Sequence, residues 1–211
     1  METLDFTTLP AEELVAIIVA TSFAAGLNVY AAVATVGLLA NSGAIVLPAP
    51  LAPLASWWVI GASGVLFAVE FVADKIPVLD VVWNALQTFV RVPAGALLAF
   101  GAAAPLSPEQ QLLAGTLGAV IAFLAHGGKT AVRAAVTFSP EPFSNIALSL
   151  GEDLVAVGLL WFATRHPFLA ATIAVVLLAA ILVLLRVVVK ALRALFRAAG
   201  TKFTHPSASS G

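Results

Sequence analysis

The chain has 211 residues, of which 61% are hydrophobic and only 10% are charged. Its mean hydropathy is +1.06. An average soluble domain has about 25% charged residues, so this composition excludes an ordinary soluble globular protein and a disordered chain. A net charge of −1 gives no field that would attract nucleic acid, and the absence of cysteine excludes disulfides and thiolate chemistry. The composition predicts an all-α, polytopic transmembrane helix bundle.

The first two predicted spans come from an uncharged stretch over residues 14–69. This stretch is too long for one helix of about 20 residues. Asn41-Ser42-Gly43 and three following prolines divide it into a span over 14–40 and a span over 54–73. Trp57 and Trp58 are expected to anchor the second span at an interface. The residues before the first span are acidic rather than basic, so we expect that span to be retained as a membrane helix and not removed as a signal peptide.

Four more spans are predicted over 77–100, 108–124, 143–163 and from 167 onwards, with a polar segment at 126–142 between the fourth and the fifth. Ser107 and Gln110 have the spacing of a capping box before the fourth span. The sixth span stays apolar to about 185 and continues as a basic helix to about 199. We therefore expect one transmembrane domain over 1–200, followed by a disordered polar tail over 201–211.

The basic residues predict the orientation of the bundle. Six spans place both termini on one side, which is also the side of Lys75, Lys129 and Arg133 and of the basic C-terminal helix. The opposite connections carry almost no charge. Because cytoplasmic loops are rich in Lys and Arg, both termini are predicted to be cytoplasmic, in a multi-pass protein of a bacterial inner membrane.

Polar residues recur within the apolar spans at the spacing of one helix face. Asp80, Asn84, Gln87 and Arg91 follow the spacing i, i+4, i+7 and i+11. Similar stripes are Thr21, Asn28 and Thr35; His126, Thr130, Arg133 and Thr137; and Asn145, Ser149 and Glu152, with Asp153 adjacent. Such residues are either hydrogen-bonding contacts between helices or functional groups. An unpaired guanidinium within a membrane is costly, so Arg91 is expected to pair across helices with an acid near Asp80, with Asp74 or with Glu152.

The sequence lacks the patterns of a catalytic or metal site. His126 is either a proton relay or a lone interfacial histidine, and with three histidines and no HExxH motif we expect no metal and no cofactor. No nucleophile motif or Gly-rich phosphate loop is present, so an intramembrane enzyme is not predicted and no catalytic residue is assigned.

Two glycine pairs raise the question of an internal duplication. Gly61 and Gly64 precede Lys75 by 14 and 11 residues, and Gly115 and Gly118 precede Lys129 by the same distances. A duplication, which is common among transporters, would make the two units parallel. Chance matches in an Ala-, Gly- and Val-rich chain are the alternative.

Four stretches of the sequence resemble a bacterial membrane family. They are FAAGLNVYAAV, FVADKIPVLDVVWNALQTFVRVPAGALLA, HGGKTAVRAAV and SPEPFSNIALSLGEDLVAV. That family is catalogued as domain of unknown function four-one-two-six. The resemblance covers about 23–163 and implies a multi-span membrane protein, without an activity or a substrate. The same stretches contain most of the polar stripes.

We weigh two functions. The first is a transporter or channel-like permease with a polar, cytoplasm-facing vestibule for a small anionic or zwitterionic solute or a lipid headgroup. Its candidate substrate-binding residues are Asn28, Tyr30, Asp80, Arg91, Lys129 and Arg133, and its candidate proton-coupling residues are Glu70, Asp74 and Glu152. The second is a non-transporting accessory or scaffold protein whose polar residues specify helix packing or bind a partner, in a homo-oligomer or a larger complex. A water-accessible cavity lined by these residues favours transport, and a dry, fully paired core favours a scaffold.

The C-terminal helix carries Arg186, Lys190, Arg193 and Arg197 on one face. An amphipathic helix leaving the bilayer is expected to bind anionic lipid headgroups on the cytoplasmic side, each base adding about 1 kcal/mol. A plain positive-inside anchor is the alternative.

Overall fold

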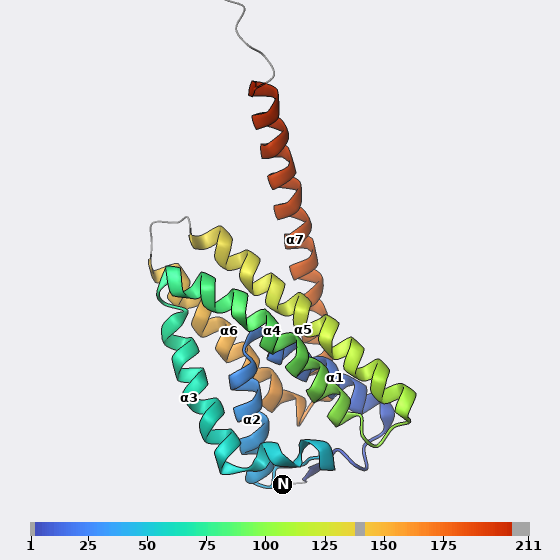
Figure 1. Ribbon diagram of the computed structural model, residues 1–211. Coiled ribbons are helices and arrows are strands. Elements are labelled where there is room, and N and C mark those ends of the chain that lie inside the picture. Colours follow the sequence, from blue (N-terminus) through green and yellow to red (C-terminus); the bar gives the residue numbers. More distant parts are fainter. Residues whose placement is uncertain (1–2, 138–141, 204–211) are drawn as a thin grey trace, which may run out of the picture.

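The structure, a computed structural model, describes residues 3–137 and 142–203 and forms a helical bundle (Figure 1). The helices are α1 (Ala11–Leu27), α2 (Val29–Asn41), α3 (Trp57–Ala73), α4 (Pro77–Ala102), α5 (Pro108–Thr137), α6 (Pro142–Ala163) and α7 (Pro167–Phe203). A 3-10 helix, η1 (Ala49–Ala55), precedes α3, and the strands β1 (Leu4–Asp5) and β2 (Ile45–Val46) pair in parallel.

The first predicted span is not one helix, because it breaks at Asn28. The backbone there is extended (φ −152°, ψ 102°), and the Asn28 side chain accepts a hydrogen bond from Ala31 N at 2.9 Å. Asparagine is a poor residue inside helices and a good cap at their start, so α1 ends and α2 begins around it. The predicted stripe of Thr21, Asn28 and Thr35 therefore does not lie along one continuous helix.

The two helices α1 and α2 form a hairpin that enters the bundle and returns to the same end. Leu4, before α1, pairs with Ile45, after α2. The helices have 17 and 13 residues, fewer than the 20 or so that cross a bilayer. We call this unit the re-entrant hairpin, with its tip at Asn28.

The remaining chain runs back and forth between two ends of the bundle. At one end, the strand end, lie β1, β2, η1 and the connections α4–α5 and α6–α7; at the other, the α7 end, lies the connection α3–α4, and α7 projects beyond it (Figure 1). Among the described residues, four helices are long and apolar enough to cross a membrane, or five if η1 and α3, bent by 66°, count as one span. The predicted six spans are not reproduced. In the bundle, β1 and the end of α7 lie at opposite ends, and the side of the membrane on which each terminus lies stays a prediction.

Several local predictions are confirmed. Ser107 Oγ accepts from Gln110 N and Gln110 Oε1 accepts from Ser107 N, which is the predicted capping box. The helix α7 begins at Pro167 as predicted and extends to Phe203, beyond the predicted limit of the domain. One boundary was wrong: α5 continues to Thr137, so His126 and Arg133 lie on a helix and not in a polar connecting segment.

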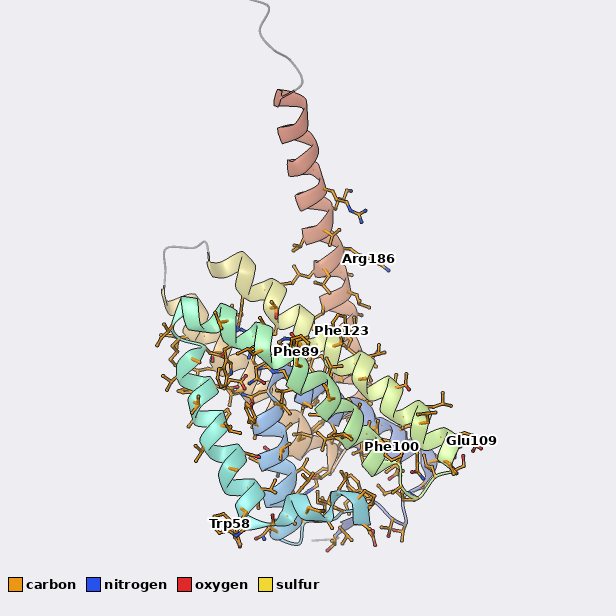
Figure 2. All side chains as sticks on the ribbon, viewed as in Figure 1. Trp58, Phe89, Phe100, Glu109, Phe123 and Arg186 are labelled. Atoms are coloured by element: carbon orange, nitrogen blue, oxygen red, sulfur yellow. The ribbon has the colours of Figure 1, made fainter. Side chains whose placement is uncertain are left out.

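Side-chain burial fits a membrane bundle. In α4, Asn84, Gln87 and Arg91 are buried, whereas Leu86 and Phe89 are 59% and 81% exposed. Trp57 and Trp58 are exposed at the start of α3, where Figure 2 shows Trp58 at the strand end. Their anchoring at a membrane interface stays a prediction. The apolar belt and the helices of membrane-spanning length show a multi-pass membrane protein.

Small residues bring the central helices together. A Cβ on Gly118 of α5 would lie 2.4 Å from Ala99 Cβ and 2.5 Å from the Gly95 carbonyl oxygen of α4. A Cβ on Gly26, near the hairpin tip, would lie 2.6 Å from the Ala122 carbonyl oxygen of α5. Close backbone approach at small residues is typical of packed membrane helices. In contrast, a Cβ on Gly61 or Gly64 would meet nothing within 4 Å, so the two glycine pairs play different roles, and the internal duplication remains a prediction.

Candidate functional site

Seven ionisable side chains meet inside the bundle, next to the tip of the re-entrant hairpin. We call them the charged cluster: Glu70 and Asp74 from α3 and its C-cap, Arg91 from α4, Lys129 and Arg133 from α5, and Glu152 and Asp153 from α6. Arg91, Glu70 and Lys129 have fully buried side chains, and Glu152, the most accessible partner in the ion pairs, is 12% exposed.

The ion pairs of the cluster form a chain across three helix interfaces. Arg91 binds Glu70, whose Oε1 also lies 3.2 Å from Lys129 Nζ. Lys129 Nζ is in turn 3.2 Å from Asp74 Oδ2 and 3.4 Å from Glu152 Oε2. Arg133 closes the chain, at 2.8 Å from Asp74 and 2.7 Å from Glu152. The predicted acidic partner of Arg91 therefore exists, but it is Glu70 rather than Asp74 or Glu152.

Two bases of the cluster also bind backbone carbonyls at the hairpin tip. Arg91 Nη1 donates to the Gly26 carbonyl at 3.2 Å, and Lys129 Nζ donates to the Leu27 carbonyl at 3.3 Å. The last carbonyls of a helix lack partners within it and carry partial negative charge. The break at Asn28 thus creates acceptors inside the bundle, and the cluster supplies cations to them.

Asn28 links the hairpin tip to α6. Its Nδ2 donates to Asp153 Oδ1 at 2.9 Å while its Oδ1 caps α2. Asn28 is fully buried and Asp153 is 7% exposed. Among the described residues Asp153 makes no ion pair, which distinguishes it from the other three acids of the cluster.

His126 extends the cluster along α5. Its Nδ1 lies 2.9 Å from Arg91 Nη1, and its Nε2 lies 3.0 Å from the Asn84 carbonyl oxygen and 2.9 Å from Thr88 Oγ1. A guanidinium can only donate, so Nδ1 accepts and Nε2 carries the proton. His126 is 3% exposed and is therefore not a lone interfacial histidine.

Other predicted site residues lie outside the charged cluster. Tyr30 in α2 accepts a hydrogen bond at 3.0 Å from Gln87 Nε2, on the predicted polar stripe of α4. Lys75, which was predicted only as a basic residue on the cytoplasmic side, follows α3 and donates to the Phe71 carbonyl at 2.7 Å. Burial lowers the pKa of Lys75, and the negative charges of Asp153 and Asp74 partly oppose this effect. The side chains of Asp80 and Arg197 lie outside the described residues.

The predicted lipid-binding residues Arg186, Lys190 and Arg193 are exposed on α7. They lie on the part of this helix that projects from the bundle, where Figure 2 shows Arg186, away from the charged cluster. Their contact with lipid remains a prediction.

A groove of about 720 Å³ runs along α5, α6 and α7. Most of its lining is apolar, including Phe23, Leu177 and Ile181. Lys129 and Glu152 are the charged residues in its lining, so one side of the charged cluster borders an open space between the helices.

Sequence reasoning missed three parts of this site. It treated Asp153 only as a neighbour of Glu152, it did not name Glu70 as the partner of Arg91, and it did not foresee the backbone carbonyls. The sequence Gly26-Leu27-Asn28 in the middle of an apolar span was the signal for these carbonyls. Without a proline, it is a weak signal for a helix break. Among the described residues, no group of three or more His, Cys, Asp or Glu side chains is arranged to hold a metal ion.

Neither the curated proteins nor the solved structures contain a match to this chain. A family model described as "Domain of unknown function (DUF4126)" matches residues 15–187, which include most of the re-entrant hairpin, with its tip at Asn28, and the whole charged cluster. The chain is therefore a member of the DUF4126 family, a family whose function is unknown.

Proposed function

We propose that this protein is a small transporter of a bacterial cytoplasmic membrane, and that its solute site lies at the tip of the re-entrant hairpin. The observation that carries the proposal is the interrupted backbone at Asn28, whose flanking carbonyls bind the buried cations Arg91 and Lys129. Broken helices with charged groups at their ends form solute and ion sites in many secondary transporters.

Energetics support a functional role for the charged cluster. Desolvating a buried ion pair often costs more than the pair returns, so such pairs are weak contributors to stability. Ionisable groups within a membrane are rare and usually mark transport pathways. Non-helical backbone at membrane depth is tolerated where it is buried in protein or lines a cavity. Seven such groups beside a broken helix contribute little to stability, so their presence supports a role in function.

The chemistry of the cluster favours a solute with an anionic group. Arg91 and Arg133 present guanidinium groups, which suit carboxylates and phosphates. In the present conformation Arg91 is paired with Glu70 and Arg133 with Asp74. An anionic solute would therefore compete with these two acids for the guanidinium groups. The nearby acids equally suit the positive group of a zwitterion. The groove along α5–α7 supports lateral entry for a lipid-like solute, because it connects the apolar belt with Lys129 and Glu152.

The charge distribution supports a definite orientation. The exposed bases Arg186, Lys190 and Arg193 lie beyond the α7 end, whereas Glu12 and Glu13 start α1 at the strand end. By the positive-inside rule, the α7 end faces the cytoplasm and the N-terminal strand faces the other side.

A second candidate function, a scaffold, is favoured by one observation. The six residues in ion pairs are all paired with one another, with side chains at most 12% exposed. Buried ion pairs that exclude water are expected in a scaffold whose polar residues only specify how the helices pack. The transport proposal therefore implies a second conformation in which water reaches the cluster.

Reconstitution into liposomes tests the transport proposal. Currents on a solid-supported membrane would be recorded after concentration jumps of amino acids, phosphate, dicarboxylates and glycerophosphocholine. We expect a current with at least one of these solutes that is lost in Arg133→Gln. The matched control is Arg165→Gln, which removes the same charge at the connection α6–α7, outside the cluster. Absence of any current with correctly folded wild-type protein would overturn the proposal in favour of the scaffold.

A further inference from the structure

We infer that Asp153 is a proton-binding site of this protein and that the ion coupled to its conformational change is H⁺. This inference deepens the proposed transport function and rests on it for its physiological meaning. It differs from the sequence-based assignment, which named Glu70, Asp74 and Glu152 as proton-coupling residues.

The acids and bases of the charged cluster do not all contact a partner of opposite charge. Its described side chains comprise four carboxyl groups, those of Glu70, Asp74, Glu152 and Asp153, and three cations, those of Arg91, Lys129 and Arg133. His126 accepts from Arg91 and so adds no positive charge. Lys75, only partly buried after α3, is a fourth cation near Asp74 and Asp153, but among the described residues it forms no ion pair with either, so Asp153 has no cation in direct contact. In a buried site an uncompensated charge is strongly unfavourable, and one bound proton removes it.

The contacts of the four acids identify the carboxyl group that holds the proton. Glu70, Asp74 and Glu152 each bind at least two of the three cations. Asp153 instead contacts the neutral amide of Asn28 through Oδ1, and its Oδ2 is buried without a hydrogen-bond partner. Glu70 Oε2 and Asp74 Oδ1 are also buried without a hydrogen-bond partner, but each of these acids contacts two cations. Among the described acids of the cluster, Asp153 alone contacts no cation, so its ionised form is the least compensated and the proton binds at its Oδ2.

The surroundings of Asp153 contain charges of both signs. Lys129 from α5 and Lys75 after α3 favour its ionised form, whereas Glu70 and Asp74 on the α3 side disfavour it. The α1–α2 side presents Asn28 alone among these contacts. A modest rearrangement that brings a lysine closer or admits water would therefore favour release of the proton.

Asn28 links proton binding at Asp153 to the position of the hairpin tip. The same side chain that holds Asp153 also caps α2 at the break of the re-entrant hairpin. In the protonated state the O–H bond forms at Oδ2 with a proton taken from water, and the neutral acid fits the closed, dry site. When that bond breaks, the proton returns to water and the carboxylate draws a lysine or water into the site, which displaces Asn28 and the hairpin tip.

Infrared spectroscopy of the full-length protein in lipid tests this assignment directly. At neutral pH, where exposed acids are ionised, we expect a C=O stretching band of a protonated carboxylic acid that shifts in D₂O. Asp153→Asn should abolish this band, and Asp153→Glu should change its frequency while keeping it. The control Glu109→Gln removes an exposed acid at the strand end and should leave the band unchanged. A missing wild-type band, or one that persists in Asp153→Asn, would overturn the inference.

The test separates this inference from the transport proposal. If the band belongs to Asp153 and no solute produces a current, the proton site stands and transport fails. If solute currents are present but the band is absent or insensitive to Asp153→Asn, transport stands and Asp153 is not the proton site. If both hold, Asp153→Asn should abolish the dependence of the solute current on an imposed pH gradient.

Discussion

Arg91 Nη1, in the middle of α4, donates a hydrogen bond to the main-chain carbonyl of Gly26 at 3.2 Å. Gly26 lies in the last turn of α1, two residues before the break at Asn28. A cation at the C-terminal end of a helix interacts favourably with the helix dipole. Within a membrane, water cannot supply the hydrogen bonds that the backbone loses where a helix ends. The contact with Arg91 therefore stabilises the end of α1 inside the bundle.

Neutralising Arg91 alone should destabilise the protein strongly. In Arg91→Gln, Glu70 keeps only Lys129 as a cationic partner, and the Gly26 carbonyl loses a charged donor. Breaking a buried ion pair on one side costs about 3–5 kcal/mol. The double variant Glu70→Gln/Arg91→Gln removes both charges and should recover part of this loss. Thermal unfolding in detergent measures both, and a single variant as stable as the wild type would contradict the buried pair.

The packing of α4 against α5 predicts opposite effects for two glycine substitutions. Gly118→Ala places a Cβ 2.4 Å from Ala99 Cβ and 2.5 Å from the Gly95 carbonyl, so the helices must separate and the melting temperature should fall. The control Gly61→Ala meets nothing within 4 Å and replaces glycine inside a helix, which favours folding by up to about 1 kcal/mol. Equal melting temperatures of the two variants would show that α4 and α5 do not pack in this way.

Much of the helix pattern could be predicted from the sequence, because apolar length, prolines and caps are local signals. The starts at Pro77, Pro108 and Pro167 and the buried face of α4 follow from them. The re-entrant hairpin could not be predicted, because its 30 helical residues (17 in α1 and 13 in α2) match the length of one long span. Its return depends on the pairing of β1 with β2 and on cations from α4 and α5, which are long-range contacts. That single turn also puts β1 at the end of the bundle opposite to the end of α7.

Single-cysteine labelling should place the two ends of the chain on opposite sides of the membrane. The chain has no native cysteine, so Thr7→Cys and Ala194→Cys, both at exposed positions, each provide one thiol. With a membrane-impermeant maleimide, we expect Thr7→Cys to react in intact spheroplasts and Ala194→Cys to react only in inverted vesicles. Labelling of both variants from the same side would restore the even number of crossings and contradict the hairpin.

The exposed bases of α7 should bind anionic lipid. Replacing Arg186, Lys190 and Arg193 with Gln removes three charges, each worth about 1 kcal/mol near an anionic leaflet. In nanodiscs, native mass spectrometry should then detect fewer retained phosphatidylglycerol molecules than on the wild type. Arg165→Gln, at the strand end, is the matched control. Unchanged lipid retention would leave these bases as orientation signals alone.

Transport requires that water and solute reach the charged cluster in a second conformation, and two buried serines can report whether they do. Ser149 in α6 is fully buried, with its Oγ 3.4 Å from Asp74 Oδ2, and Ser22 in α1 is equally buried away from the cluster. Each can be changed to cysteine with little change in volume in this cysteine-free chain. The measurement is the rate of reaction with a small, charged methanethiosulfonate reagent in proteoliposomes. We expect Ser149→Cys to react and Ser22→Cys not to react. If both remain unreactive, the cluster stays dry and the protein does not transport solute through it.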